Sequence, residues 1–122
     1  MSGPASNDAP DPRATRHWLS QRFSAMALVP LGLWFLYSVL GLPDLGYGSV
    51  NAWIAMPLHA AMLVLFAWCA LWHSVLGLQV VVEDYVAREL QRPVIRALQL
   101  LHGIAAIVAA HSIWLIAGGP AA

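Results

Sequence analysis

Charged residues divide the chain into long apolar stretches. Three stretches contain no Asp, Glu, Lys or Arg; they are residues 23–43, 45–82 and 97–122. An α-helix rises about 1.5 Å per residue, so about 20 apolar residues cross the hydrocarbon core of a bilayer, which is roughly 30 Å thick. The pattern predicts three transmembrane helices, near residues 22–42, 55–82 and 96–118.

The apolar stretches also define the expected fold class. Lipid offers no hydrogen-bond partner to an open backbone, so each spanning segment is expected to be helical and the protein to be an all-α membrane protein. Pro30 lies inside the first predicted helix and predicts a kink. Between the first two helices, residues 43–54 are rich in Gly, Pro, Asp and Asn, which predicts turns.

The segment before the first helix is polar and contains Pro4, Pro10 and Pro12. It predicts a flexible N-terminal tail over residues 1–16, followed by a membrane anchor domain over residues 17–122. A cleaved signal peptide is the alternative for the first apolar stretch. That stretch exceeds the roughly 7–15 apolar residues of a signal peptide, and no A-x-A cleavage pattern follows it directly, so a spanning helix is favoured.

Composition supports lipid as the surrounding solvent. Hydrophobic residues make up 60% of the chain and charged residues only 10%, whereas soluble domains contain about 25% charged residues. The net charge is zero, which argues against the basic patch of a nucleic-acid-binding protein. Cys69 is the one cysteine, so the chain forms no internal disulfide and cannot ligate an iron–sulfur cluster by itself.

The arginines predict how the chain is oriented in the membrane. All six lie in two segments, residues 13–22 and 88–96, and the sequence contains no lysine. Cytoplasmic loops carry the excess of basic residues, so the N-terminus and the 83–96 segment are expected in the cytoplasm. The 43–54 segment and the C-terminus, which have no basic residue, are expected on the opposite, periplasmic side.

Two histidines fall inside the second predicted helix, where polar side chains are costly and mark functional sites by default. His73 lies ten residues before Glu83, which is about 15 Å of helix and therefore near the middle of the hydrocarbon core. A neutral imidazole at this depth has two interpretations. It ligates a cofactor, or it forms a hydrogen bond with a serine or a carbonyl group on a neighbouring helix.

The spacing around His73 places Gly77 and Asp84 on the same helical face. Gly77 is one turn further along, and Asp84 is eleven residues on, which returns to within about 20° of the same direction. A glycine beside a histidine leaves room for a flat ligand such as a haem ligated by His73. The alternative is that Gly77 allows another helix to approach closely.

At the end of this face, Asp84 and Tyr85 combine a carboxylate and a phenol near the predicted membrane surface. They are candidates for hydrogen bonding and proton supply to a ligand that enters from the bilayer, or they simply anchor the helix end. Arg22 lies at the same surface. It can pair with Asp84, extend to lipid phosphate or bind an anionic cofactor group, and the sequence does not choose among these partners.

A haem with two histidine ligands needs a second imidazole at the depth of His73. His59 is fourteen positions away on the same helix, about 21 Å, and cannot serve. His102 and His111 lie nearer the two surfaces, although His102 is closer in depth. The second ligand is therefore expected from another subunit.

Two segments resemble a known family. The pattern His73-x3-Gly77-x6-Asp84-Tyr85 resembles the smaller, cytochrome b-type hydrophobic membrane anchor subunit of succinate dehydrogenase, respiratory complex II. HWLSQRFSAMALVPLGLW, at 17–34, resembles the start of that subunit in alphaproteobacteria. In layout the likeness covers residues 17–118.

The resemblance implies a subunit of a succinate:ubiquinone oxidoreductase in the bacterial inner membrane. Such an anchor docks a flavoprotein and an iron–sulfur subunit, shares a b-type haem with a second cytochrome b anchor subunit, and helps to form the ubiquinone site. By position, His73 would be an axial haem ligand, and Tyr85 would bind a quinone carbonyl with support from Asp84. Arg22 and His17 would serve the haem propionates or the edge of the quinone site.

Two other functions stay open from the sequence. The chain could anchor a fumarate reductase or a two-haem cytochrome b, with His59 among the further ligands. It could also be a non-redox assembly or transport subunit whose histidines are structural.

Overall fold

The computed structural model describes residues 11–118, and every regular element in that range is an α-helix. The four helices are α1 (Pro12–Leu40), α2 (Tyr47–Ile54), α3 (Pro57–Tyr85) and α4 (Arg88–Gly118). The three long helices, of 29, 29 and 31 residues, are long and apolar enough to cross a membrane. The prediction of an all-α membrane protein with three spanning helices is therefore confirmed.

The long helices extend further than the apolar stretches that predicted them. Helix α1 begins at Pro12 rather than near residue 22, and α4 begins at Arg88 rather than near residue 96. The start of α1 is set by Asp11, whose carboxylate accepts a hydrogen bond of 2.9 Å from the Arg13 amide, and by the proline that follows it. Of the predicted tail, residues 1–10 lie outside the described residues, and residues 12–16 are helical.

The prediction of turns throughout residues 43–54 is wrong, because residues 47–54 form helix α2. The glycines and polar residues of this segment concealed an apolar face formed by Val50, Trp53 and Ile54. Trp53 is only 8% exposed, and its ring stacks on Trp34 with the centroids 5.9 Å apart. Burial of this face against α1 and α3 outweighs the weak helix propensity of the segment.

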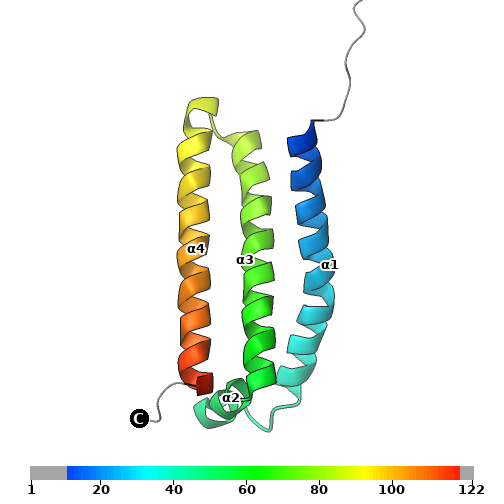
Figure 1. Cartoon of the computed structure of the whole chain (residues 1–122), viewed down its shortest axis with the longest axis vertical. Helices are drawn as coiled ribbons and strands as arrows, with labels where there is room; N and C mark the ends of the chain where they lie inside the picture. Colours follow the sequence, from blue (N-terminus) through cyan, green and yellow to red (C-terminus); the bar gives the residue numbers. More distant parts are fainter. Residues whose placement is uncertain (1–10, 119–122) are drawn as a thin grey trace, which may run out of the picture.

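The three long helices form an open row with α3 in the middle (Figure 1). Helix α3 packs against both α1 and α4, and α2 lies across one end against α3 and α4. In the part of the chain that the structure describes, the backbones of α1 and α4 do not approach each other. Most of the apolar side chains on the two broad faces of the row therefore remain available to lipid or to another subunit.

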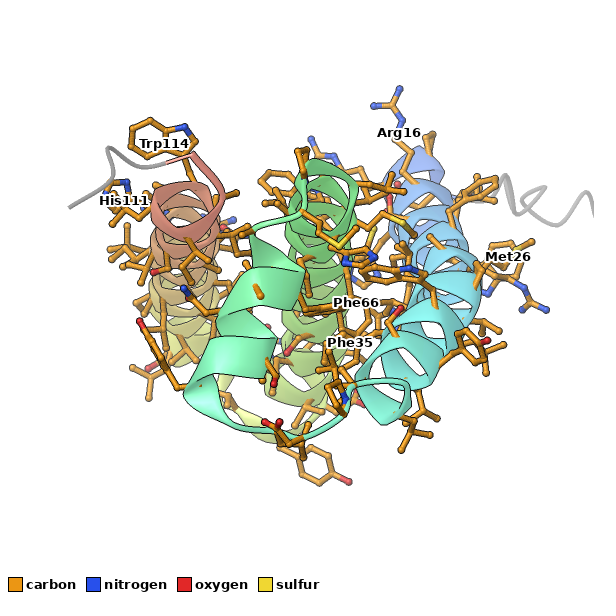
Figure 2. The ribbon with its side chains drawn as sticks, turned by 90° about the horizontal axis from the view of Figure 1, so that it is seen from below. Arg16, Met26, Phe35, Phe66, His111 and Trp114 are labelled. Carbon is orange, nitrogen blue, oxygen red and sulfur yellow. The ribbon has the colours of Figure 1, made fainter. Side chains whose placement is uncertain are left out.

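Aromatic residues fill the space between α1 and α3 near the α2 end. The rings of Phe35 and Phe66 stack with their centroids 5.2 Å apart, and both lie between these helices in Figure 2. Pro30 lies inside α1, one turn before these contacts, and α1 bows along its length in Figure 1. The predicted bend at Pro30 therefore lies next to the aromatic packing that joins the two helices.

The two ends of the row differ sharply in charge. One end, called here the charged end, is formed by the start of α1, the end of α3 and the start of α4 (top of Figure 1). The half of the row nearest this end contains all six arginines, of which Arg22 lies deepest, ten residues into α1, together with Asp11, Glu83, Asp84 and Glu89. Among the described residues, Asp44 is the one charged side chain at the opposite, α2 end.

Candidate functional site

The structure directs His73 toward α1. Its ring is half-buried, and Nδ1 lies 3.0 Å from the hydroxyl oxygen of Ser24. Ser24 is 8% exposed, and its hydroxyl donates a hydrogen bond of 2.9 Å to the backbone carbonyl of Gln21. A bond to a serine on a neighbouring helix, one of the two interpretations left open by the sequence, is therefore present, and it occupies one of the two ring nitrogens.

Ser24 was not singled out by the sequence pattern, because a first helix that starts near residue 22 places Ser24 at the membrane surface, whereas α1 starts at Pro12. Helices α1 and α3 run in opposite directions. Ser24 lies 12 residues after Pro12, the first residue of α1. His73 lies 12 residues before Tyr85, the last residue of α3. The two side chains therefore lie at about the same depth from the charged end, and a serine in an apolar stretch at that depth is a natural partner for the imidazole.

Gly77 faces open space. A Cβ atom built at this position would meet no other atom within 4 Å. Neither α1 nor α4 therefore approaches the backbone there, and the close packing of a helix from this same chain does not explain the glycine. The surface one turn from His73 has room for a group supplied from outside the chain.

Asp84 and Tyr85 are the last two residues of α3, at the charged end and directly before the short turn into α4. Both side chains are exposed, Tyr85 by 85%. The turn is held by Gln91 of α4, whose amide nitrogen donates to the backbone oxygens of Glu83 at 3.0 Å and Val86 at 2.9 Å. Gln91 therefore fixes the backbone next to Asp84 and Tyr85. This role was not identified from the sequence, because residue 91 was predicted to lie in a loop between two helices.

Arg22 lies two residues before Ser24 on α1, near the depth of His73, and not at the surface beside Asp84 where it was expected from the sequence. His17 lies closer to the charged end. The Arg22 guanidinium lies 5.0 Å above the centroid of the Trp18 ring, an arrangement that favours a cation–π contact. His17 is half-buried, and its Nε2 is buried without a hydrogen-bond partner among the described residues. His17 precedes Ser24 by seven residues, so the two share a helical face about 10 Å apart.

The other histidines are engaged within the chain. His59 Nδ1 lies 3.0 Å from the backbone oxygen of Trp53. His102 uses both nitrogens: Nδ1 lies 2.8 Å from the Leu98 carbonyl oxygen and Nε2 lies 3.2 Å from the Ser74 hydroxyl. His111 is exposed and stacks on Trp114, away from the other helices (Figure 2).

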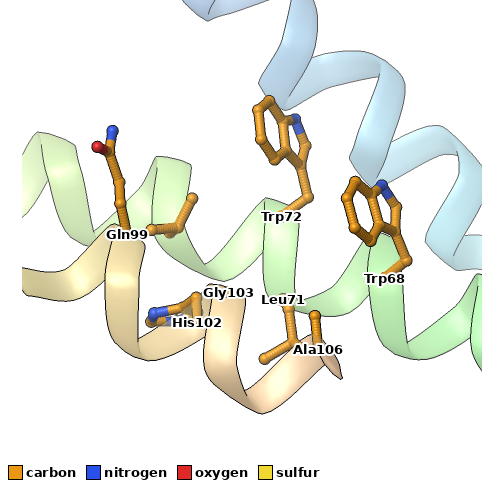
Figure 3. Close-up of a pocket in the computed structure, with 8 residues that line it drawn as sticks. Trp68, Leu71, Trp72, Gln99, His102, Gly103 and Ala106 are labelled. Carbon is orange, nitrogen blue, oxygen red and sulfur yellow. The ribbon is translucent and has the colours of Figure 1, made fainter. Parts of the chain in front are cut away.

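An apolar groove lies between α3 and α4, on the other side of α3 from Ser24. Two α3 tryptophans, Trp68 and Trp72, border it together with His102, Gly103 and Ala106 of α4 (Figure 3). Its volume is about 130 Å³, and an adjoining groove that shares Trp68, Gly103 and Ala106 has a volume of about 380 Å³. Neither groove includes His73 or Gly77, whose face is an open surface, so a cofactor bound there would need a second wall from another chain.

Comparison with known sequences places the chain in a family. The sequence pattern of the family described as "Succinate dehydrogenase/Fumarate reductase transmembrane subunit" matches residues 9–113. The chain belongs to this family. The succinate dehydrogenase hydrophobic membrane anchor subunit of Rickettsia bellii is 33% identical over 97 residues, which cover 79% of this chain and 78% of the relative.

A second relative of the chain is also a succinate dehydrogenase anchor subunit. The hydrophobic membrane anchor subunit of Rickettsia conorii is 27% identical over 106 residues, which cover 86% of this chain and 84% of the relative. The resemblance inferred from residues 17–34 and 72–87 is therefore confirmed. With its three spanning helices, the chain is a multi-pass membrane protein of an oxidoreductase family.

Proposed function

We propose that this chain is the anchor subunit of a succinate:ubiquinone oxidoreductase. It docks the flavoprotein and iron–sulfur subunits, shares a b-type haem with a second cytochrome b anchor subunit, and forms part of the ubiquinone reduction site. The observation that carries the proposal is His73, near the middle of α3, which uses one ring nitrogen for Ser24 and lies one turn from the open space at Gly77.

The residues around this face fit a haem. His73 would be an axial ligand, and Gly77 leaves space for the macrocycle. Arg22 supplies a cation and His17 a buried, unpartnered nitrogen in the direction of the charged end, where anionic propionates would be stabilised. When bound, the haem would supply a one-electron carrier whose potential depends on its axial ligands.

A second anchor subunit follows from the two requirements of such a haem. The first is another axial ligand, and His102 is excluded within this chain because both of its nitrogens are engaged. The second is another wall, because α1, α3 and α4 form an open row. A partner with its own membrane histidine, packed on the open face beside His73, would satisfy both requirements.

The charged end is the proposed docking surface for the flavoprotein and iron–sulfur subunits. The half of the row toward this end contains all six arginines, so the positive-inside rule orients it toward the cytoplasm of a bacterium, with the chain in the inner membrane. Tyr85 and Asp84 lie at this end, where electrons from the soluble subunits would arrive. The Tyr85 hydroxyl would donate to a quinone carbonyl, and Asp84 would help to resupply the two protons that accompany the two electrons of quinone reduction.

Purification through an affinity tag on this chain tests the proposed function. We expect a flavoprotein, an iron–sulfur protein and a second membrane subunit to copurify, with one b-type haem per complex and succinate-dependent ubiquinone reduction. Two haems per complex would instead indicate a two-haem cytochrome b. A preparation without flavin or haem would overturn the proposal and indicate a non-redox assembly subunit.

Filling the space at Gly77 is expected to displace the haem. In Gly77→Leu, the new side chain projects into the space assigned to the cofactor, so haem binding should weaken about 5- to 150-fold, the equivalent of overpacking by about 1–3 kcal/mol. Haem per flavin in the purified complex measures the effect. Gly103→Leu is the matched control, because Gly103 also has no neighbouring atom within 4 Å but lies on α4. Equal haem contents in the two variants would rule out a haem beside Gly77.

A further inference from the structure

The Ser24 hydroxyl has a single hydrogen, and its use determines the tautomer of His73. The hydroxyl donates that hydrogen to the Gln21 carbonyl oxygen at 2.9 Å. Serines inside helices commonly bond back to a preceding carbonyl in this way. If the hydroxyl donated to His73 Nδ1 instead, Ser24 Oγ and the Gln21 oxygen would lie 2.9 Å apart with no hydrogen between them. The arrangement that satisfies both contacts therefore has the imidazole Nδ1–H donating to Ser24 Oγ at 3.0 Å. His73 therefore has its hydrogen on Nδ1, and Nε2 keeps a free lone pair.

We propose that Ser24 is a positioning residue for His73, which fixes the tautomer and ring orientation in which Nε2 ligates the haem iron. Metal-bound histidines commonly donate their second N–H to a nearby acceptor, which orients the ring and raises its basicity. Here the acceptor comes from α1 and the ligand from α3. Helix α1 would therefore control the ligand without contacting the iron.

The surroundings of Ser24 suit this role. Its side chain is 8% exposed, so in the membrane interior little water is available to replace it as the acceptor for the His73 Nδ1–H. Its own hydroxyl is held by the bond to Gln21, so the acceptor oxygen has a fixed position. A hydroxyl is also neutral, so it adds less basicity to the imidazole than the carboxylate found beside many metal-bound histidines.

His102 provides an internal contrast. It also contacts a serine, but through Nε2, while its Nδ1 lies 2.8 Å from the Leu98 carbonyl oxygen. Since a carbonyl only accepts, Nδ1 carries the hydrogen and the Ser74 hydroxyl donates to Nε2. That bond consumes the lone pair that iron would need. The two His–Ser pairs therefore have opposite effects: one leaves a ligand nitrogen free and the other blocks it.

Three substitutions at Ser24 in the whole complex test this role. Ser24→Thr keeps the hydroxyl, Ser24→Val has nearly the shape of threonine without it, and Ser24→Ala removes it without adding volume. We expect Ala and Val to weaken haem binding about 10- to 100-fold, measured by transfer of haem to an apoglobin. The haem midpoint potential should rise in both, because a less basic imidazole stabilises ferric iron less well. Threonine should resemble the wild type in both measurements.

The Thr and Val pair separates hydrogen bonding from packing. Equal loss of haem affinity in Ser24→Thr and Ser24→Val would assign the effect to packing and overturn the role of Ser24. A haem affinity and a haem midpoint potential in Ser24→Ala equal to those of the wild type would also overturn it. Because the role rests on the proposed haem ligation, His73→Ala is measured in parallel. If His73→Ala keeps its haem, the proposed ligation by His73 is wrong. If His73→Ala loses its haem and Ser24→Ala does not, only the role of Ser24 is wrong.

Discussion

Replacing His73 by alanine is expected to remove the b-type haem from the purified complex while leaving its flavin and iron–sulfur contents unchanged. On the proposed ligation the substitution deletes a ligand of the haem iron, and its neighbours on this face cannot replace it. The Ser24 hydroxyl is held by Gln21, and Gly77 has no side chain. The reduced-minus-oxidised spectrum and the haem content per flavin measure the loss, which should exceed the Gly77→Leu and Ser24→Ala losses.

His102→Ala is the matched control for this prediction. His102 is also half-buried in a spanning helix, and its removal breaks a bond of 3.2 Å between α4 and α3. It should lower the stability of the anchor, since it leaves Ser74 without its partner, yet keep the haem. Full haem content in His73→Ala would show that His73 is not the ligand. Similar haem loss in both variants would show that packing between the helices, rather than ligation, holds the cofactor.

The parts of the fold that follow from hydrophobicity could be predicted from the sequence. The lipid interior excludes charged side chains, so the three uncharged stretches indicated where the spanning helices lie and how deep His73 is. These stretches are residues 23–43, 45–82 and 97–122. Helix ends were less accessible to this reasoning. The hydrocarbon core limits where charges can lie, but it does not end a helix. As a result, α1 and α4 continue through the arginine-containing segments.

Contacts between helices could not be predicted from spacing alone. The spacing of His73, Gly77 and Asp84 defines a shared face on α3, but not how α1 is rotated about its own axis. That rotation brings Ser24 to His73. Helix α2 escaped prediction for a related reason, because its stability depends on burying Trp53 against Trp34, a contact distant in the sequence.

Replacing Tyr85 by phenylalanine is expected to slow ubiquinone reduction about 10- to 100-fold without changing the haem content. The ring is retained, and the side chain is 85% exposed in this chain, so little packing is lost. What disappears is a hydroxyl that would donate to the quinone carbonyl, where charge develops during reduction. Hydrogen bonds to charged groups contribute about 1.5–3 kcal/mol, which corresponds to this range of rates. Succinate-dependent ubiquinone reduction by the purified complex is the measurement.

Tyr47→Phe is a close control for Tyr85→Phe, because Tyr47 is 86% exposed but lies at the opposite, α2 end. The complex with Tyr47→Phe should reduce ubiquinone at the wild-type rate. A wild-type rate in Tyr85→Phe as well would show that the quinone binds elsewhere. The kinetic form of the defect is also informative. A hydrogen bond that strengthens as the quinone is reduced lowers kcat and kcat/KM together, whereas one that only holds the quinone raises KM alone. A reduced kcat with unchanged electron transfer from succinate to a soluble acceptor dye would place the defect in quinone chemistry, as proposed for Tyr85.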